Sequence, residues 1–266
     1  MLHTGMRIMS TPDRPLVSVV TVTLNAEHSL GETLRSVATQ DYPAIEHIII
    51  DGASTDRTQD VVRQHGRRVS CFVSEPDKCV YEAMNKGLRR AAAASELITF
   101  LNAGDTFSDP STVGRVVADA KHLPGCHVYG DITRSGRRVA APTTFNLWFL
   151  ATNMLCHQAV FFRTVQHRRF PYDESYPLCA DYKLFADMLR ARERFARIQV
   201  VIADYAPGGL SATRRQELHA EKRRIRRQHP KLRLLHILKR ALRKPRRASV
   251  LKGKGARGVS VSQRQG

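Results

Sequence analysis

The sequence predicts an α/β protein whose core is an open, mostly parallel β-sheet flanked by helices. Apolar, β-branched runs alternate with amphipathic segments over about a hundred residues after Pro15, which is typical of βαβ units. The first run, VSVVTVTL, has no polar face, as expected of a strand that is covered on both faces of a parallel sheet. Polar residues gather where these runs end. The 266 residues are enough for one large α/β domain.

Four strands and three helices are expected in the first half, which we assign to residues 16–109. The expected strands are 17–24, 45–51, 69–75 and 96–102, and the expected helices begin near residues 30, 56 and 81. Thr55 or Asp56 is expected to cap the second helix, because their side-chain oxygens can accept hydrogen bonds from the free N–H groups of a first helical turn.

The second half, residues 110–211, is expected to extend the same sheet. Its pattern is looser, but it predicts a helix that ends near 121, strands at 126–132, 157–163 and 198–205, a hairpin at 134–137 and a helix at 181–192. Together the halves predict one domain over residues 16–211.

Residues 212–266 are predicted to form a separate basic extension. They carry 19 Lys and Arg against two Glu, whereas residues 1–211 carry 24 basic and 22 acidic residues. The extension therefore carries +17 of the net charge of +19. It indicates a solvated tail or a surface for an anionic partner, and no specific nucleic acid is expected.

A helix is expected at 230–244, between Pro230 at its start and Pro245 after its end. Its apolar stripe comprises Leu234, Leu235, Leu238, Ala241 and Leu242, with Lys and Arg around it. Two interpretations stay open: a helix docked on the domain, or a helix in the plane of an anionic membrane. The last twenty residues have the composition of a disordered segment.

The five cysteines are odd in number, widely spaced and without a C-x-x-C pair, which favours reduced thiols over a disulfide framework or a zinc site. The first fifteen residues lack the apolar region of a signal peptide, and no run reaches the roughly 18 apolar residues that span a bilayer. We therefore expect a cytoplasmic protein, with peripheral contact to the inner face of the plasma membrane as an option for the basic helix.

The polar strand ends predict the position of a site. Four clusters follow the four expected strands: Asn25, Asp51, residues 75–77 and residues 102–105. In open α/β sheets, ligands bind beyond the carboxyl ends of the strands, so these clusters should converge. Several acids and few bases favour Mg²⁺ or Mn²⁺, which one or two carboxylates typically hold together with water and substrate phosphate oxygens.

Three of the candidate residues also have a structural interpretation. Asp105, in FLNAGD, can cap the segment that ends at Pro110. Asp51 begins DGASTD, which is ordinary turn and cap chemistry. Lys86 is placed to neutralise phosphate charge, but it can equally lie on a solvated helix face. The residues alone leave these alternatives open.

Several motifs in order carry a resemblance to a known family: VVTVTLNAEHSLGETLRSVATQDYPAIEHIIIDGASTDRT, SEPDKCVYEAMNKGL, ITFLNAGD, VYGD and CHQAVF. They resemble the family 2 glycosyltransferases of GT-A fold, and in pattern those of the colanic-acid type that build bacterial exopolysaccharides and cell-surface glycans. The resemblance covers about residues 16–211.

The resemblance implies a donor site for a nucleotide-diphosphate sugar, such as a UDP- or GDP-sugar, with Mn²⁺ or Mg²⁺. Asp105 matches the family's metal ligand. The positions that match donor-binding residues are Thr23, Asn25, Asp51, Asp77, Lys78, Asn85, Lys86, Asn102, Ala103 and Gly104.

The resemblance also implies an acceptor side. Asp181, in CADYKL, matches the family's catalytic base, and a helix N-cap is the alternative role for it. The positions that match acceptor-side residues are His157, Gln158, Gly208, Gly209 and Ser211. One base and one displacement imply inversion at the anomeric carbon.

This chain departs from the family's pattern at two positions. Cys79 stands where Gly is common, which would strain the backbone if φ is positive there. Gly104-Asp105 stands where many members have two adjacent acids, and a weaker or more hydrated metal site is the expected result.

We therefore expect a metal-dependent, inverting glycosyltransferase that acts on a cell-envelope or exopolysaccharide acceptor, which a lipid can carry. A sugar nucleotidyltransferase is one alternative, although TLNAEHSLGET lacks the Gly-rich, Arg-containing loop of that class. A dinucleotide-binding oxidoreductase lacks its G-x-G-x-x-G fingerprint here. A catalytically inactive GT-A binding protein, with a tail that binds anionic surfaces, is the other alternative.

Overall fold

Four parallel strands form the first half of the sheet in the computed structural model, which describes residues 14–206 and 214–243. They are β1 (Leu16–Thr23), β2 (Ile45–Asp51), β3 (Val69–Ser74) and β4 (Ser95–Phe100). Their order is β3-β2-β1-β4, and all three pairings are parallel. The strand positions predicted from the sequence are confirmed to within one or two residues.

The second half continues the same sheet, as predicted, but with mixed strand directions. The order runs on as β8-β6-β9-β5, with β7 paired to β6, in a nine-stranded sheet of the described residues. These strands are β5 (Thr106–Phe107), β6 (Cys126–Arg134), β7 (Arg137–Val139), β8 (Val160–Arg163) and β9 (Arg194–Tyr205). The pair β6 and β9 is parallel, and the other pairings in this half are antiparallel. The predicted hairpin at 134–137 joins β6 to β7.

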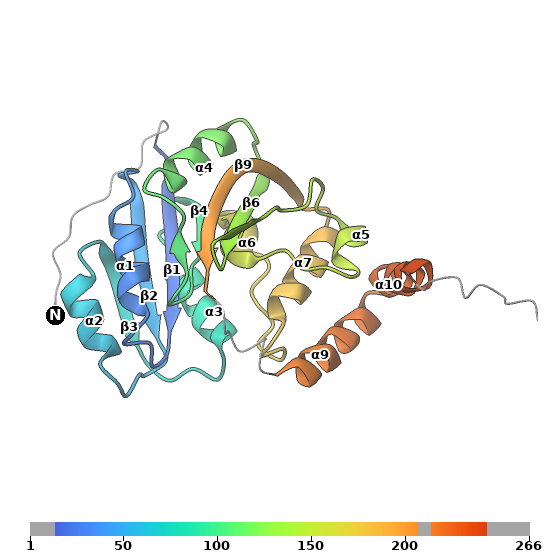
Figure 1. Ribbon diagram of the computed structural model, residues 1–266, viewed down its shortest axis with the longest axis horizontal. Helices are drawn as coiled ribbons and strands as arrows, with labels where there is room; N and C mark the ends of the chain where they lie inside the picture. The colour runs from blue at the N-terminus through green and yellow to red at the C-terminus, as the bar shows by residue number, and fades with distance from the viewer. Residues whose placement is uncertain (1–13, 207–213, 244–266) are drawn as a thin grey trace, which may run out of the picture.

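Helices cover both faces of the sheet (Figure 1). One face carries α1 (Leu30–Ala38), α2 (Thr58–His65) and α4 (Thr112–Lys121). The other carries α3 (Val80–Arg90), α6 (Thr164–Arg168) and α7 (Ala180–Arg190). The short helix α5 (Leu147–Leu150) and the turn η1 (His157–Ala159) lie in the connection between β7 and β8.

The absence of a polar face on β1 has the expected cause, because the strand is sandwiched. Val17 and Val19 pack in the core that contains α4, whereas Val20 and Val22 pack in the core that contains α3. Helix α3 approaches β1 very closely at Gly87, where an added Cβ would lie 2.2 Å from Val20 Cγ1. Only glycine allows that approach.

Two C-terminal helices pack on the domain beside α5 and α7 (Figure 1). Helix α10 (Pro230–Arg243) was predicted, whereas α9 (Arg215–Gln228) was not. Ile225 of α9 and Leu232 of α10 are completely buried in the core of α3 and α7. Helix α9 escapes a sequence search because only Leu218 and Ile225, seven residues apart, carry its apolar face among many cations.

No helix among the described residues is long and apolar enough to cross a membrane. The segment expected to be disordered lies outside the described residues.

Three buried histidines predict how stability depends on pH. Burial lowers the pKa of His47 and of His127 to about 3 and that of His167 to about 4, whereas unfolded histidine has a pKa of about 6.5. The unfolded chain therefore takes up protons that the folded chain does not. The free energy of unfolding should therefore be highest above pH 6.5. It should fall between pH 6.5 and pH 4 by about 1.4 kcal/mol per pH unit for each histidine.

Urea unfolding between pH 7 and pH 5 measures this slope. His47→Gln should reduce this slope, because glutamine does not titrate. The neutral amide can also keep the contact of His47 Nε2 with Thr21 Oγ1, 2.9 Å away in the core. His122→Gln changes an exposed histidine and should leave the slope as it is. A flat profile in the wild type would contradict the burial of neutral imidazoles.

Candidate active site

The loops after β1 and β2 are joined to each other by polar contacts. The Asn25 backbone N–H donates to Ser54 Oγ at 2.8 Å, and Asn25 Oδ1 accepts from the Thr55 N–H at 2.9 Å. Asp51 is completely buried and accepts from the Ser54 N–H and hydroxyl. Asn25 (φ 48°) and Ala53 (φ 61°) adopt left-handed backbone conformations, which are concentrated at functional sites. Asp51 thus organises the turn, which is one of its two predicted roles.

The loop after β3 is held by Lys86 of α3. Its Nζ lies 2.7 Å from Asp77 Oδ1 and 3.0 Å from Glu75 Oε1, and it donates to the Pro76 carbonyl oxygen at 2.9 Å. Loss of hydration lowers the pKa of Lys86, but the hydrogen bonds to these two carboxylates outweigh this effect, so the pKa is raised. All three ammonium protons therefore have protein partners, and Lys86 orders this loop.

Asp77 reaches the loop after β2. A side chain at Gly52 would come within 3.4 Å of Asp77 Oδ2, so the ends of β2 and β3 meet there as the sequence predicts. Burial raises the pKa of Asp77 against the opposing effect of Lys86. Lys78 is exposed beside it, and its backbone N–H donates to Glu82 Oε2 at 2.6 Å. Cys79 has a φ of −163°, which is extended backbone, so its side chain causes no strain.

Asn85 does not join the other predicted donor residues. It is buried, and its Nδ2 donates to the Tyr172 carbonyl oxygen and to Glu174 Oε1, both at 2.9 Å. Its Oδ1 accepts from the Tyr172 N–H at 2.9 Å. Both ends of the amide have partners, so Asn85 connects α3 to the chain before α7.

The FLNAGD segment ends at a buried junction. Asp105 is 4% exposed, and its Oδ2 accepts from Gln158 Nε2 and its Oδ1 from the Ala206 N–H, both at 2.8 Å. Burial raises the pKa of Asp105, and these two hydrogen bonds and the nearby His157 oppose the shift. The carboxylate therefore links the end of β4 to η1 and to the end of β9. Gly104, at φ 98°, makes the turn that directs it inward.

Helix α1 also bonds to the backbone of this junction. Thr33 Oγ1 accepts from the Gly104 N–H at 2.9 Å and donates to the Asp105 carbonyl oxygen at 2.8 Å. The position of the segment is thus set by backbone contacts as well as by the carboxylate. The Asp105 side chain does not cap the segment that ends at Pro110. Asp109 makes the local contact there, because its Oδ1 accepts from the Ser111 N–H at 2.8 Å.

Three buried polar atoms at these strand ends have no hydrogen-bond partner in the described part of the chain: Thr23 Oγ1, Asp77 Oδ2 and Asn102 Oδ1. All three belong to residues that the sequence predicts to bind the donor. Buried polar atoms normally have partners, so each of these exceptions requires a water, an ion or a ligand as its explanation. These atoms fit a polar ligand such as a nucleotide.

A divalent cation fits this edge only with few protein ligands. Among the described residues, no group of three or more His, Cys, Asp or Glu could hold a metal ion. Asn102 Oδ1 has no partner there, and the Asp105 oxygens, each with one hydrogen bond, keep further lone pairs. Mg²⁺ and Mn²⁺ sites with one or two protein ligands, completed by water and phosphate oxygens, agree with such a donor set. The role of Asp105 as metal ligand stays a prediction.

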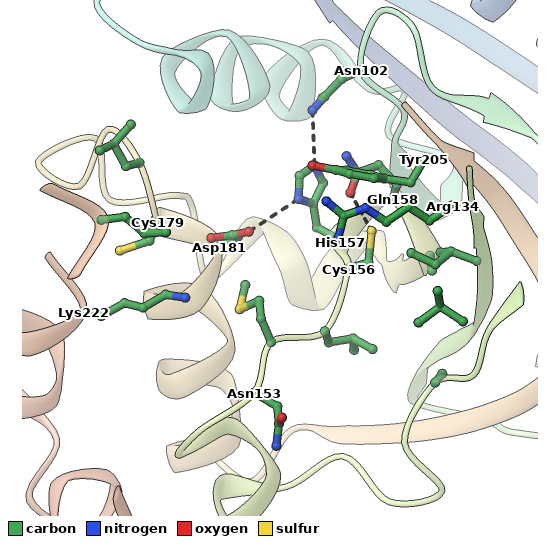
Figure 2. A pocket seen from close by; sticks show the side chains of 18 of the residues that line it. Asn102, Arg134, Asn153, Cys156, His157, Gln158, Cys179, Asp181, Tyr205 and Lys222 are labelled. Carbon is green, nitrogen blue, oxygen red and sulfur yellow. Dashed lines mark hydrogen bonds and ion pairs between the residues drawn. The ribbon is translucent and has the colours of Figure 1, made fainter. Parts of the chain in front are cut away.

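A cavity of about 880 Å³ opens beside Asn102 and contains Asp181. His157 lies between them: its Nδ1 is 3.5 Å from Asp181 Oδ2, and its Nε2 is 3.5 Å from Asn102 Nδ2 (Figure 2). Asp181 belongs to the first turn of α7, whose N-cap is Cys179, so Asp181 is not the N-cap. Its carboxylate lines the cavity. The pKa of Tyr81 is raised first by the burial of that tyrosine and second by the charge of Asp181.

The predicted acceptor-side pair therefore has two functions in the structure. His157 connects the catalytic candidate to the donor edge, and Gln158 connects Asp105 to Cys156, whose thiol donates to Gln158 Oε1 at 2.9 Å. Both residues line the cavity. Gly208, Gly209 and Ser211 lie outside the described residues.

Sequence reasoning missed one wall of the cavity, which α9 provides. Four α9 residues line the cavity: Arg215, Leu218, His219 and Lys222. We expected the whole site within 16–211, because the cations of 212–266 look like those of a solvated tail. The spacing of Leu218 and Ile225 was the only available signal that this helix packs.

Comparison with known proteins identifies the family that this sequence matches. The model of the family described as "Glycosyl transferase family 2" matches residues 18–170. A PGL/p-HBAD biosynthesis glycosyltransferase of Mycobacterium bovis is 32% identical over 208 residues, which cover 75% of this chain and 80% of that protein. A putative teichuronic acid biosynthesis glycosyltransferase, TuaG of Bacillus subtilis, is 36% identical over 95 residues, 35% of this chain and 37% of TuaG.

Two solved structures are similar in fold. S. aureus TarS 1–349 in complex with UDP-GlcNAc has a TM-score of 0.64 at 17% identity, over 79% of this chain and 65% of that chain. Mannosyltransferase PcManGT from Pyrobaculum calidifontis, in complex with GDP-Man and Mn²⁺, has a TM-score of 0.57 at 22% identity, over 86% of this chain and 65% of that chain. This chain spans 39% of another TarS structure. The predicted GT-A fold is confirmed.

Replacing Asp105 with Ala should lower the free energy of unfolding by about 2 kcal/mol or more, because a buried donor left without an acceptor costs about 1–3 kcal/mol and Gln158 and Ala206 would both lose theirs. Urea unfolding measures the change. Asp60→Ala removes a carboxylate from an exposed pair with Arg63 and should change stability by less than about 1 kcal/mol. Unchanged stability of Asp105→Ala would contradict the junction and favour a dedicated ligand.

Proposed function

We propose a specific reaction for this chain, which belongs to glycosyl transferase family 2. It moves a sugar from a nucleotide-diphosphate donor to a hydroxyl group of a lipid-linked cell-envelope or exopolysaccharide acceptor, with inversion. The observation that carries this proposal is the line of contacts from Asn102, at the donor edge, through His157 to Asp181 in the cavity. The names of relatives in PGL/p-HBAD and teichuronic acid biosynthesis support an envelope acceptor.

The donor is proposed to lie across the carboxyl ends of β1 to β4, where the nucleoside meets Thr23, Asn25 and the Asp77 loop. UDP- and GDP-sugars are both candidates, since the related structures hold UDP-GlcNAc and GDP-Man. The diphosphate would reach Asn102 and the turn at Gly104.

In the proposed mechanism, the hydroxyl oxygen of the acceptor attacks the anomeric carbon, and Asp181 takes the proton of that hydroxyl. The bond to the nucleoside diphosphate breaks on the opposite side, so a single displacement inverts that carbon. His157, paired with Asp181 at 3.5 Å, holds the carboxylate towards the acceptor.

Mn²⁺ or Mg²⁺, when bound, would offset the charge that develops on the departing diphosphate. Asn102 Oδ1 and Asp105 are the residues proposed to hold it, with donor phosphate oxygens and water as the remaining ligands. The bound Mn²⁺ of PcManGT supports a metal.

Asp181→Asn should reduce sugar transfer by about 10²- to 10⁴-fold, because an amide cannot accept the proton. Thermal shifts with UDP or GDP should not change, since Asp181 lies on the acceptor side. Asp119→Asn on α4, at the other face of the sheet, is the matched control and should keep activity. Full activity of Asp181→Asn would exclude this residue as the base.

Donor hydrolysis separates the proposed enzyme from its alternatives. UDP-GlcNAc and GDP-Man are incubated with and without Mn²⁺, and release of the nucleoside diphosphate is measured. A glycosyltransferase should release UDP or GDP, whereas a sugar nucleotidyltransferase would need pyrophosphate and would release a nucleoside triphosphate. An inactive binding protein would shift in melting temperature with nucleotide and turn over neither donor.

We also propose that α10 contacts an anionic membrane while the protein stays on the cytoplasmic side. The α10 surface consists of four exposed apolar side chains, Leu234, Ile237, Leu238 and Leu242, together with the neighbouring Trp148 of α5. The opposite edge of the helix is docked, because His236 Nδ1 lies 2.7 Å from the Ala151 carbonyl oxygen and Leu232 is buried. The helix has five Lys and Arg and no Asp or Glu, which complements anionic headgroups.

Replacing Leu234, Ile237 and Leu238 together with Ser should weaken binding to phosphatidylglycerol vesicles by about tenfold or more, because apolar area would no longer leave water. Vesicle sedimentation measures this partitioning. Val165→Ser removes an apolar side chain that is 67% exposed elsewhere and serves as the control. The proposal fails if the triple variant partitions like the wild type.

A further inference from the structure

We propose that α9 binds a phosphate group of the acceptor. The α9 wall, defined as Arg215, His219 and Lys222 where they line the cavity, would hold this group while the acceptor hydroxyl lies at Asp181. The inference rests on the proposed function and deepens it, since it names an anionic, lipid-linked acceptor and makes the C-terminal extension part of the active site.

The α9 wall is fixed next to the catalytic candidate. Glu221 Oε2 accepts hydrogen bonds from the Leu178 N–H at 3.1 Å and the Cys179 N–H at 3.0 Å, at the start of α7. The carboxylate thereby satisfies N–H groups at the end of the helix that carries Asp181. Lys222 follows Glu221 directly in this fixed helix, and it lines the same cavity as Asp181.

Further contacts make α9 a part of the domain. Ile225 is completely buried, Arg224 stacks over the Tyr176 ring at 3.8 Å, and Arg226 Nε donates to Tyr182 Oη at 3.3 Å. These cations face the domain. Arg215, His219 and Lys222 of the α9 wall line the cavity, and Lys222 Nζ also lies 5.4 Å from the Tyr182 ring centroid.

The charges of the cavity favour an anion. Figure 2 shows Lys222 extending from α9 into the space near Asp181, with Arg134 on the other side of the cavity beside Tyr205. Among the described residues, no carboxylate forms an ion pair within 4.0 Å with Arg215, Lys222 or Arg134, and Asp181, which His157 pairs, is the only acid that lines the cavity. A phosphate would offset these positive charges and accept several hydrogen bonds.

The rest of the cavity favours an apolar group attached to that phosphate. Its wall contains Pro142, Phe149, Met154 and Leu155. Phe149 follows Trp148, which is exposed beside α10, where Lys239 Nζ lies 4.7 Å from the Trp148 ring centroid. The apolar side of the cavity therefore continues through α5 to the α10 surface. A lipid phosphate would use both the cations and this apolar path, because its chain can extend along the path from a membrane. A free phosphate or an uncharged glycan would use only one of these two features.

Isothermal titration calorimetry with decyl phosphate, decyl maltoside and inorganic phosphate, each below micellar concentrations, tests the proposal. Decyl phosphate should bind saturably and at least about fivefold more tightly than either other probe, because it alone satisfies the cations and the apolar wall. Lys222→Gln and Arg215→Ala should each weaken decyl phosphate binding by about threefold or more and leave decyl maltoside binding unchanged. Arg223→Ala, which removes an exposed cation of the same helix outside the cavity lining, should change neither.

Several results would overturn the proposal. Equal binding of decyl phosphate and decyl maltoside would exclude anion recognition, and equal binding of inorganic phosphate would exclude a lipid-linked ligand. Wild-type affinity in both α9 variants would exclude the α9 wall. UDP and GDP thermal shifts are measured in parallel: a loss in Lys222→Gln would assign the wall to the donor. No shift in the wild type would contradict the proposed function and leave the decyl phosphate result standing.

Discussion

The buried carboxylate of Asp105 is the interaction on which the site depends. It lies at the point where the parallel half of the sheet meets the mixed half, and it bonds to η1 and to the end of β9. A carboxylate that is 4% exposed is costly to bury unless its oxygens are satisfied. Because both oxygens are satisfied, the predicted donor edge at Asn102 and the cavity at His157 have one fixed spacing, which a two-substrate reaction requires.

A second carboxylate has a similar effect on the predicted acceptor side. Glu221 comes from outside the expected domain, yet it bonds to the N–H groups that begin α7. The residues around Asp181 therefore depend on a helix that begins more than a hundred residues after the end of β4. This connection unites the membrane surface proposed for α10, the cavity and helix α7 in one packed unit.

The residues of the site differed in how well the sequence predicted them. The strand ends at Asn25, Asp51, Asp77 and Asn102 were predictable, because parallel strands bring their carboxyl ends to one edge. The partners of Asn85 and Lys86 were not. An amide and an ammonium near a site can bind a ligand or hold a loop, and only their neighbours decide: Tyr172 and Glu174 for the first, Asp77 and Glu75 for the second.

The sequence by itself determined the alternation of parallel strands and helices from β1 to β4 and the helix at 230–244, because these follow from local periodicity and from short-range turn and cap chemistry. The family also followed from motifs that lie within short segments. Only the tertiary structure decided that FLNAGD directs its acid inward, that His157 reaches Asp181, and that α9 closes the cavity. Each of these depends on contacts between segments 24 to 101 residues apart, and such contacts are set by packing and by the satisfaction of buried polar groups, which no local pattern encodes.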